Sequence, residues 1–251
     1  MIENEQKYNY IVPFYFGSRM NREYSNKIKE NKFFFAEKHT DFLKKYKKNN
    51  IEKVIFVVNM TAKDNLDEIQ EFFSKNSEQI SDKIEVNLLF RENEHFSYGA
   101  WNHAIIDDLN SKNQNSKYYF CFEEDYLPVD DDFSIPFIEK CNEDTPYICS
   151  KAVVNHSNYI DHPSISIGVF LKDACRKVYE NNQYVFLLHG DNSYVGAWNI
   201  QLTFYKPFLD MGYKIDDILN EYSFPFMCSD TNTIKYFGDP NNKTLIKPVQ
   251  V

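Results

Sequence analysis

YYFCFEEDYLP, residues 118–128, is the stretch around which the rest of the chain can be arranged. Five residues with a strong preference for β-strands run directly into three consecutive carboxylates at 123–125, and Pro128 then prevents the strand from continuing. Neighbouring carboxylates repel one another, so such a cluster usually has a cation, a proton or a solvated surface around it. Two interpretations follow. The cluster is a divalent-metal site that holds a phosphorylated ligand at the end of a central strand, or it is a solvated acidic turn, which the further acids at 130–132 favour.

Upstream of this stretch, strand patterns and helix patterns alternate. Strands are predicted at 8–16, 54–58, 84–90 and 118–122, and helices at 32–48, 64–76 and 97–109. This alternation is typical of a parallel sheet with right-handed crossovers. The predicted fold class is therefore α/β, a Rossmann-like fold with a mixed central sheet flanked by helices, and residues 1–127 are its nucleotide-binding half.

The second half, residues 128–251, has a different pattern of predicted elements. Strands are predicted at 147–149 and 165–171, helices at 173–180 and 193–211, and an extended segment or lid from 231 onward. Because no Gly/Ser-rich linker separates the halves, residues 1–251 are predicted to form a single domain with two functional regions.

Composition excludes several classes of protein. The formal net charge of −9 over 251 residues argues against a dedicated nucleic-acid binder, which needs a basic surface. The five cysteines are odd in number and form no CxxC pair, so they are expected to be reduced and mostly buried. No signal-peptide pattern and no run of 18 apolar residues occurs, so we expect a cytoplasmic protein without a transmembrane segment. The oligomeric state is left open.

The usual phosphate-binding loops are absent from the sequence. Neither GxGxxG nor GxxxxGK[ST] occurs, so neither a dinucleotide-binding Rossmann site nor a P-loop is indicated. A bound phosphate would then be neutralised by a metal ion and by side chains such as Arg19 or Arg91, although arginines at such positions are more often surface residues.

Two segments carry a resemblance to a known family. RENEHFSYGAWNHA at 91–104, followed by the strand into EED at 123–125, resembles the core of family 2-type glycosyltransferases with the glycosyltransferase A fold. In that family an Asn-rich loop and a Gly-x-x-Asn helix precede a strand that ends in a DxD or EDD motif. VVNMTAKD at 57–64 is similar to the family's second strand and its V-D-x-x-S-x-D turn, with Asn59 in place of the first Asp. The resemblance covers about the first half of the chain.

The resemblance implies a site for a nucleotide-sugar donor. Glu123 and Asp125 would hold a Mn²⁺ or Mg²⁺ ion on the diphosphate of the donor, and Glu124 would lie near the ribose. The remaining donor-binding residues that it implies are Pro13, Phe14, Tyr15, Asn59, Asn93 and Asn102, with Arg19 and Arg91 as candidate diphosphate contacts.

An inverting transferase also needs a base that accepts the proton of the acceptor hydroxyl. In the family this acid begins a helix after the mixed half of the sheet, where this chain has HGDNS at 189–193, so Asp191 is the candidate. The alternative is that Asp191 only caps the helix, a role that Asp fills well. The resemblance also implies that residues 128–251 bind the acceptor. His189 and His162 are candidates for contacts to it, but a lone histidine is more often structural.

The expected function is transfer of a sugar from a nucleotide-diphosphate donor, a UDP-sugar by preference, to a hydroxyl of a glycan or glycoconjugate, with inversion and with a metal ion. Two alternatives stay open. A sugar-phosphate nucleotidyltransferase shares this sheet pattern, but its glycine-rich first loop is missing here. A non-catalytic module that binds glycans or nucleotides on a degenerate transferase scaffold is suggested by Asn59, which replaces the family's Asp, and by the reduction of the family's Glu-Asp acid pair to the single Asp191.

Overall fold

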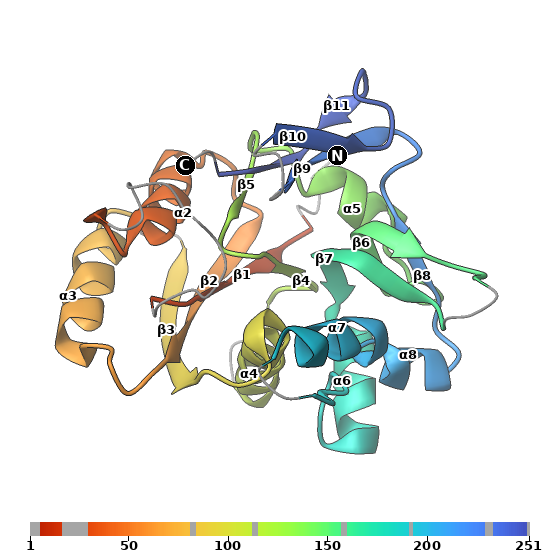
Figure 1. Ribbon diagram of the computed structural model, residues 1–251, viewed down its shortest axis with the longest axis horizontal. Helices are drawn as coiled ribbons and strands as arrows, with labels where there is room; N and C mark the ends of the chain where they lie inside the picture. Colours follow the sequence, from red (N-terminus) through yellow and green to blue (C-terminus); the bar gives the residue numbers. More distant parts are fainter. Residues whose placement is uncertain are drawn as a thin grey trace.

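The computed structural model describes residues 6–16, 30–80, 84–111, 115–156, 160–190, 193–228 and 233–249. Its centre is a seven-stranded sheet with the order β3-β2-β1-β4-β7-β6-β8 (Figure 1). The strands of this sheet are β1 (Tyr8–Phe14), β2 (Ile51–Met60), β3 (Glu85–Glu92), β4 (Tyr118–Cys121), β6 (Tyr147–Val153), β7 (His162–Leu171) and β8 (Ile215–Asp217). The helices are α2 (Phe34–Lys45), α3 (Leu66–Ser77), α4 (Phe96–Asn110), α5 (Ile135–Lys140), α6 (Lys172–Asn182), α7 (Tyr194–Thr203) and α8 (Lys206–Asp210).

The parallel half of the sheet consists of β3, β2, β1 and β4. β1 pairs with β2 on one side and with β4 on the other, and β3 lies beyond β2. The strand order therefore reverses at β1, because the chain moves outward to β3 and then returns to the far side of β1 as β4. In open α/β sheets ligands bind outside the carboxyl ends of the strands at such a point. The ends of β1 and β4 are thus the edge on which a site is expected.

The other half of the sheet is mixed. β7 pairs antiparallel with both β4 and β6, and β8 pairs parallel with β6. Gly168 of β7 lies between β4 and β6, where a Cβ atom would approach the carbonyl oxygen of Ile148 to 2.1 Å. Only glycine fits this position, because that oxygen belongs to a neighbouring strand and cannot move aside cheaply.

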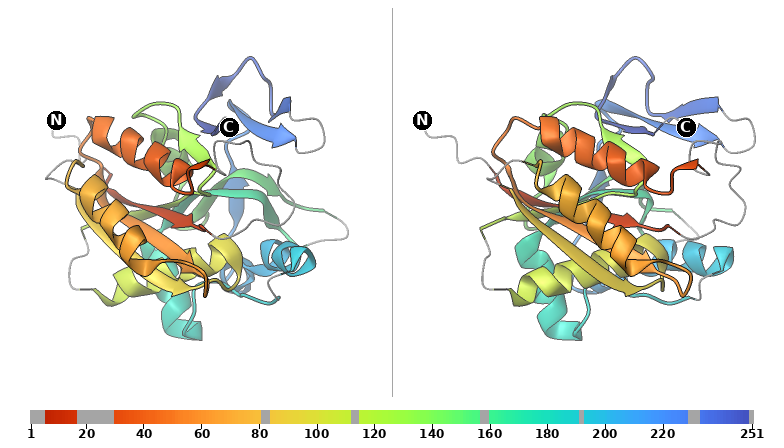
Figure 2. Two further views of the ribbon diagram at one scale, coloured as in Figure 1. Left: turned by 60° about the vertical axis from the view of Figure 1, so that its left-hand side comes forward. Right: turned by 90° about the vertical axis from the view of Figure 1, so that its left-hand side faces the viewer.

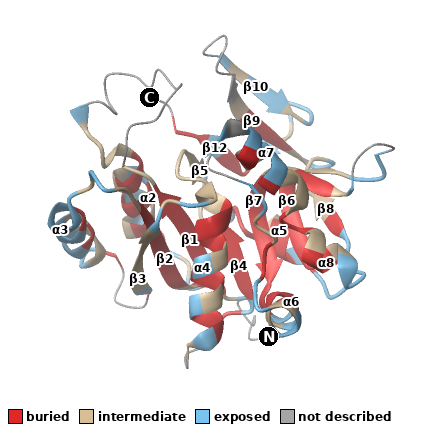
Figure 3. Ribbon diagram, turned by 60° about the horizontal axis from the view of Figure 1, so that its bottom comes forward, coloured by how far each residue is buried: buried red, intermediate tan, exposed pale blue. Residues whose placement is uncertain are grey.

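Helices cover both faces of the parallel half. Figure 2 shows α2 and α3 on one face and α4 with α6 on the other. Phe14 of β1 packs its ring against Phe73 of α3 at a centroid distance of 5.6 Å. On the opposite face, Lys53 of β2 contacts Asp108 of α4. Since both faces are covered, β2 reads as a nearly continuous apolar run, and Val54–Val58 is fully buried (Figure 3).

The chain after β8 forms short strands that belong to two smaller sheets. One sheet has the order β10-β9-β11, with β9 (Tyr222–Cys228), β10 (Thr233–Phe237) and β11 (Lys243–Thr244). The other consists of β12 (Ile246–Pro248) and β5 (Tyr126–Pro128), which comes from the middle of the chain. β12 pairs antiparallel with β5, opposing Pro248 to Tyr126. The extended tail expected from 231 onward is therefore joined by hydrogen bonds to the segment that follows the acidic cluster.

The predicted α/β fold with a mixed central sheet flanked by helices is confirmed. The single helix predicted over 193–211 is wrong, because α7 ends at Thr203 and α8 starts at Lys206. Pro207 explains the break, since it has no N–H to continue the helical hydrogen bonds from α7 and lies instead in the first turn of α8, where an N–H has no partner within the helix. The short helix α5 was not predicted. Within the described ranges, the structure contains no helix that is both long and apolar enough to cross a membrane.

Candidate functional site

The three carboxylates lie at the carboxyl edge of the sheet, in a turn between β4 and β5 that we call the acidic turn (Glu123–Asp125). The turn begins directly beside the end of β1, because the backbone N–H of Phe122 donates to the carbonyl of Ile11 at 2.9 Å. The backbone N–H of Tyr15 then donates to Oε2 of Glu124 at 3.1 Å. The acidic turn therefore lies at the point of strand reversal, where an α/β sheet binds its ligands.

The backbone of the acidic turn is fixed by three separate parts of the chain. Its three successive carbonyl oxygens accept hydrogen bonds from the N–H of Tyr126 at 3.2 Å, from Nε2 of His39 at 3.0 Å and from the N–H of Val249 at 2.7 Å. These donors come from β5, from α2 and from the residue after β12. The direction of the carboxylates is thus set by contacts that are far apart in the sequence.

The start of α4 holds the turn from the other face of the sheet. Ser97 donates a hydrogen bond to Oε2 of Glu123. Trp101 lies one turn further along the helix and is fully buried, and its Nε1–H donates to the carbonyl of Phe122 at 3.0 Å. The Trp therefore has a structural role, packing α4 against the end of β4 with its polar atom satisfied.

The carboxylate oxygens of the acidic turn are suitable ligands for a hard divalent cation that binds together with a phosphorylated ligand. Carboxylate oxygens are the ligands that Mg²⁺ and Mn²⁺ prefer, and Mg²⁺ is usually bound through one or two carboxylates together with substrate phosphates. Over the described ranges, no group of three His, Cys, Asp or Glu side chains is arranged to hold a metal ion. If a divalent cation binds here, Glu123 and Asp125 are the side chains of the turn that would hold it.

Asn59 and Arg91 form a pair at the ends of β2 and β3. The two residues are register partners, and Nη1 of Arg91 donates to Oδ1 of Asn59 at 2.7 Å and to the carbonyl of Glu94 at 2.8 Å. Because a guanidinium can only donate, the carboxamide of Asn59 must turn its oxygen towards the arginine. Gly99 of α4 allows this arrangement, since a Cβ atom there would lie 2.9 Å from Nη2.

The other residues expected to bind the donor occupy different environments. Pro13 and Phe14 are buried as the last two residues of β1, and Tyr15 is half-buried at the edge of the sheet. Asn93 is half-buried, and its backbone N–H extends the β2–β3 pairing by donating to the carbonyl of Met60 at 3.1 Å.

Asn102 anchors the loop between α6 and α7. Its Oδ1 accepts hydrogen bonds from the backbone N–H groups of Val185 and Phe186, each at 3.0 Å. The side-chain oxygen of Asn102 therefore serves the fold directly.

The acceptor side is described in part. Arg19 and Asp191 lie outside the described residues. His189 is exposed, whereas His162 is 5% exposed at the start of β7, with Nδ1 2.8 Å from the carbonyl of Ile160. The N-cap of α7 is Ser193, whose Oγ accepts from the N–H of Gly196 at 3.0 Å. The capping role considered for Asp191 is thus filled by Ser193.

Sequence reasoning missed His39 and Ser97, whose side chains bind the acidic turn within the described residues. His39 is fully buried in α2, and burial lowers the pKa of its imidazole to about 3, so the ring is neutral. The available signal was a polar side chain within the apolar positions of a predicted helix. Such a residue needs a hydrogen-bond partner in the core.

No protein-family model matches the chain, and no curated protein matches its sequence. Several solved structures are similar. Residues 1–349 of TarS from S. aureus are 13% identical with a TM-score of 0.48, over 97% of this chain and 60% of that structure. 4-Diphosphocytidyl-2C-methyl-D-erythritol synthase is 9% identical with a TM-score of 0.48, over 84% of this chain and 89% of the other. HddC from Yersinia pseudotuberculosis is 14% identical with a TM-score of 0.41, over 66% of this chain and 78% of the other.

The chain spans 60% of the length of the TarS structure. All three TM-scores lie below 0.5.

Proposed function

We propose that the chain is a glycosyltransferase that moves a sugar from a nucleotide-diphosphate donor to a hydroxyl group of a glycan or glycoconjugate. The observation that supports it best is the acidic turn, which presents three carboxylates at the point of strand reversal beside the end of β1. Among the residues that the structure describes, Tyr15, His39, Ser97, Tyr126 and Val249 donate hydrogen bonds to this turn. A solvated surface turn would need no such support from four distant elements.

Glu123 and Asp125 would hold a Mn²⁺ or Mg²⁺ ion, which offsets the charge that develops on the leaving nucleoside diphosphate. The chain itself supplies the walls of the donor site. The end of β1 and Tyr15 border the turn on one side, and Asn59 and Arg91 lie further along the same edge, at the ends of β2 and β3. This arrangement matches a ligand that lies along the carboxyl edge, with its diphosphate at the acidic turn.

In the proposed reaction the bond between the anomeric carbon and the diphosphate oxygen breaks, and its electron pair leaves with the nucleoside diphosphate. The acceptor oxygen forms the new bond to the anomeric carbon from the opposite face, which inverts the configuration. The acceptor proton passes to a carboxylate, for which Asp191 is the candidate. The proposed donor is a UDP-sugar.

The test is a thermal-unfolding panel with UDP, GDP, CDP and their common sugars, each with Mn²⁺ and again with excess chelator. A ligand at 100 times its Kd stabilises the folded state by about 2.7 kcal/mol, which raises the Tm of a chain of this size by roughly 5–10 °C. We expect a metal-dependent shift with one nucleotide class, lost in Asp125→Asn.

Asp130→Asn is the matched control, because Asp130 is an exposed acid five residues away whose carboxylate pairs with Lys243 at 3.1 Å. If no nucleotide produces a metal-dependent shift, or if the two variants behave alike, the acidic turn is a structural feature and the proposal is wrong.

Asp191→Asn separates an enzyme from a non-catalytic binding module. An enzyme should lose turnover in this variant while it retains its affinity for the donor, and a binding module should lose nothing. Product formation is measured by the release of the nucleoside diphosphate.

A further inference from the structure

His39 connects the core of the protein to the acidic turn. The side chain is fully buried in α2, and both of its ring nitrogens have partners. Nδ1 lies 2.8 Å from the hydroxyl oxygen of Tyr10 in β1, and Nε2 lies 3.0 Å from the carbonyl oxygen of Glu124. Three aromatic rings meet the imidazole edge to face, with centroid distances of 5.7 Å for Phe14, 6.0 Å for Tyr10 and 6.1 Å for Phe122. The ring therefore has no room to turn away.

The partners determine which nitrogen carries the proton. A carbonyl oxygen can only accept, so Nε2 must carry the hydrogen that is donated to Glu124. The ring is neutral, so Nδ1 is then the acceptor and takes the hydrogen of the Tyr10 hydroxyl. The result is a chain of hydrogen bonds in one direction, from Tyr10 through His39 to the backbone of the acidic turn. Chains of this kind strengthen each of their bonds.

The carbonyl that receives this bond is placed centrally in the turn. It belongs to the peptide group that joins Glu124 to Asp125, so fixing it also fixes the backbone from which the Asp125 side chain departs. The carbonyl before it and the carbonyl after it are held by backbone N–H groups, which substitutions other than Pro leave in place. His39 is thus the side chain whose substitution releases the central carbonyl of the turn.

We propose that His39 is a positioning residue for the acidic turn, and that together with Tyr10 it sets the direction in which Glu123 and Asp125 present their carboxylates to a metal-bound diphosphate. This inference depends on the proposed function, because it assigns a purpose to the same carboxylates. Outer-shell groups that orient metal ligands change metal affinity by about 10–100-fold when they are removed.

Two substitutions separate the roles of the two imidazole nitrogens. The amide of Gln reaches as far as Nε2, so His39→Gln keeps a donor for the Glu124 carbonyl. The amide of Asn reaches only as far as Nδ1, so His39→Asn keeps a partner for Tyr10 and loses the donor to the turn. Both variants remove the aromatic ring from the same buried site, so the two share any general loss of packing.

The readout is the affinity for Mn²⁺ in the presence of a saturating nucleoside diphosphate, measured from the EPR signal of free Mn²⁺. We expect His39→Asn to weaken Mn²⁺ binding by about 10-fold or more, and His39→Gln to stay within about 3-fold of the unsubstituted protein. Tyr10→Phe should weaken binding less than His39→Asn. Equal Mn²⁺ affinities in the Gln and Asn variants would overturn the positioning role.

A second measurement separates this inference from its premise. Hydrogen exchange of the peptide that spans the acidic turn, read by mass spectrometry without any ligand, should be faster in His39→Asn than in His39→Gln. If the unsubstituted protein binds no nucleotide with Mn²⁺, the proposed function fails. The positioning role would then be judged by exchange alone, and identical exchange in the two variants would overturn it.

Discussion

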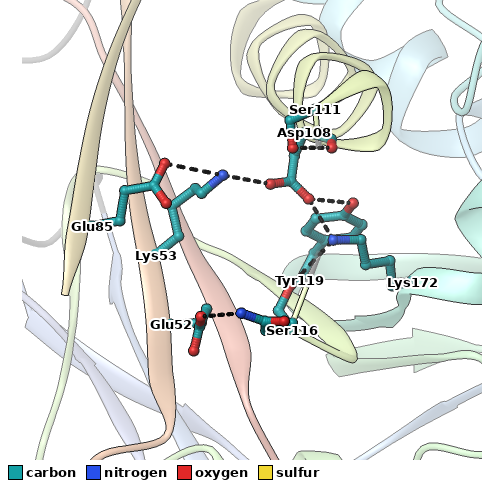
Figure 4. A network of polar contacts seen from close by, with 9 residues as sticks. Glu52, Lys53, Glu85, Asp108, Ser111, Ser116, Tyr119 and Lys172 are labelled. Atoms are coloured by element: carbon teal, nitrogen blue, oxygen red, sulfur yellow. Dashed lines mark hydrogen bonds and ion pairs between the residues drawn. The ribbon is translucent and has the colours of Figure 1, made fainter. Parts of the chain in front are cut away.

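Replacing Asp108 by Asn should destabilise the protein more than any other single change of charge in the described part of the chain. Asp108 is 1% exposed in α4, and its carboxylate is shared by three donors (Figure 4). Nζ of Lys53 lies 2.9 Å from Oδ1, and Nζ of Lys172 lies 2.7 Å from Oδ2. The hydroxyl of Tyr119 also donates to Oδ2, at 2.9 Å. One buried carboxylate thus forms ion pairs with two lysines whose side chains are each 4% exposed.

The magnitude follows from what the substitution leaves behind. Burial alone would raise the pKa of Asp108, but the hydrogen bonds from Lys172 and Lys53 outweigh it and lower this pKa, so the carboxylate is charged. Asn removes that charge and turns an NH₂ group towards one ammonium. Breaking a buried ion pair by removing one partner costs about 3–5 kcal/mol. The free energy of unfolding of a whole domain is only about 5–15 kcal/mol.

The assay is urea unfolding followed by circular dichroism, with Glu85→Gln as the control. Glu85 lies 3.3 Å from the same Lys53, but its side chain is 45% exposed, so its loss should cost less than about 1 kcal/mol. The network lies at the amino ends of the strands, at the opposite edge from the acidic turn, so the folded fraction of Asp108→Asn should bind ligands normally. If Asp108→Asn costs no more than Glu85→Gln, the reasoning about the buried charge is refuted.

Three further outcomes follow from the structure. His39 is protonated near pH 6.5 in the unfolded chain but only near pH 3 in the folded chain, so the free energy of unfolding should fall by about 2 kcal/mol between pH 6.5 and pH 5. The urea midpoints at these two pH values should be closer together in His39→Gln. Gly168→Ala should cost roughly 1–3 kcal/mol through its clash with Ile148, whereas Gly212→Ala, with φ of 85° and open space around it, should cost only about 1 kcal/mol in the same urea assay. Asn59→Asp adds a carboxylate oxygen that can accept the N3–H of uracil, so calorimetry should show tighter binding of UDP relative to CDP, and an unchanged ratio would remove Asn59 from the base site.

Local sequence patterns predict the parallel half of the fold because each of its strands and helices carries its own signal. Both faces of β2 are covered, and its run of buried apolar residues is visible without any partner. The boundaries that were missed depend on other elements. β6 continues to Val153 beyond the predicted 147–149, because β7 begins at His162 and offers it a partner there. A pairing of this kind is not encoded by the residues of either strand alone.

In the candidate site, too, local features can be predicted from the sequence, whereas contacts between distant elements cannot. The sequence locates the acidic turn, since the strand, the three acids and the proline are consecutive. It does not reveal what fixes the turn, because His39, Ser97 and Val249 lie 85, 26 and 124 positions from their partners. The tail illustrates this difference. It was expected to be an extended segment or lid, but it forms hydrogen bonds on both sides of β5, through Val249 to the acidic turn and through Leu245 to Val129. The spacing of acids thus indicates where a cation can bind, whereas their orientation depends on contacts from α2, α4 and the chain around β12.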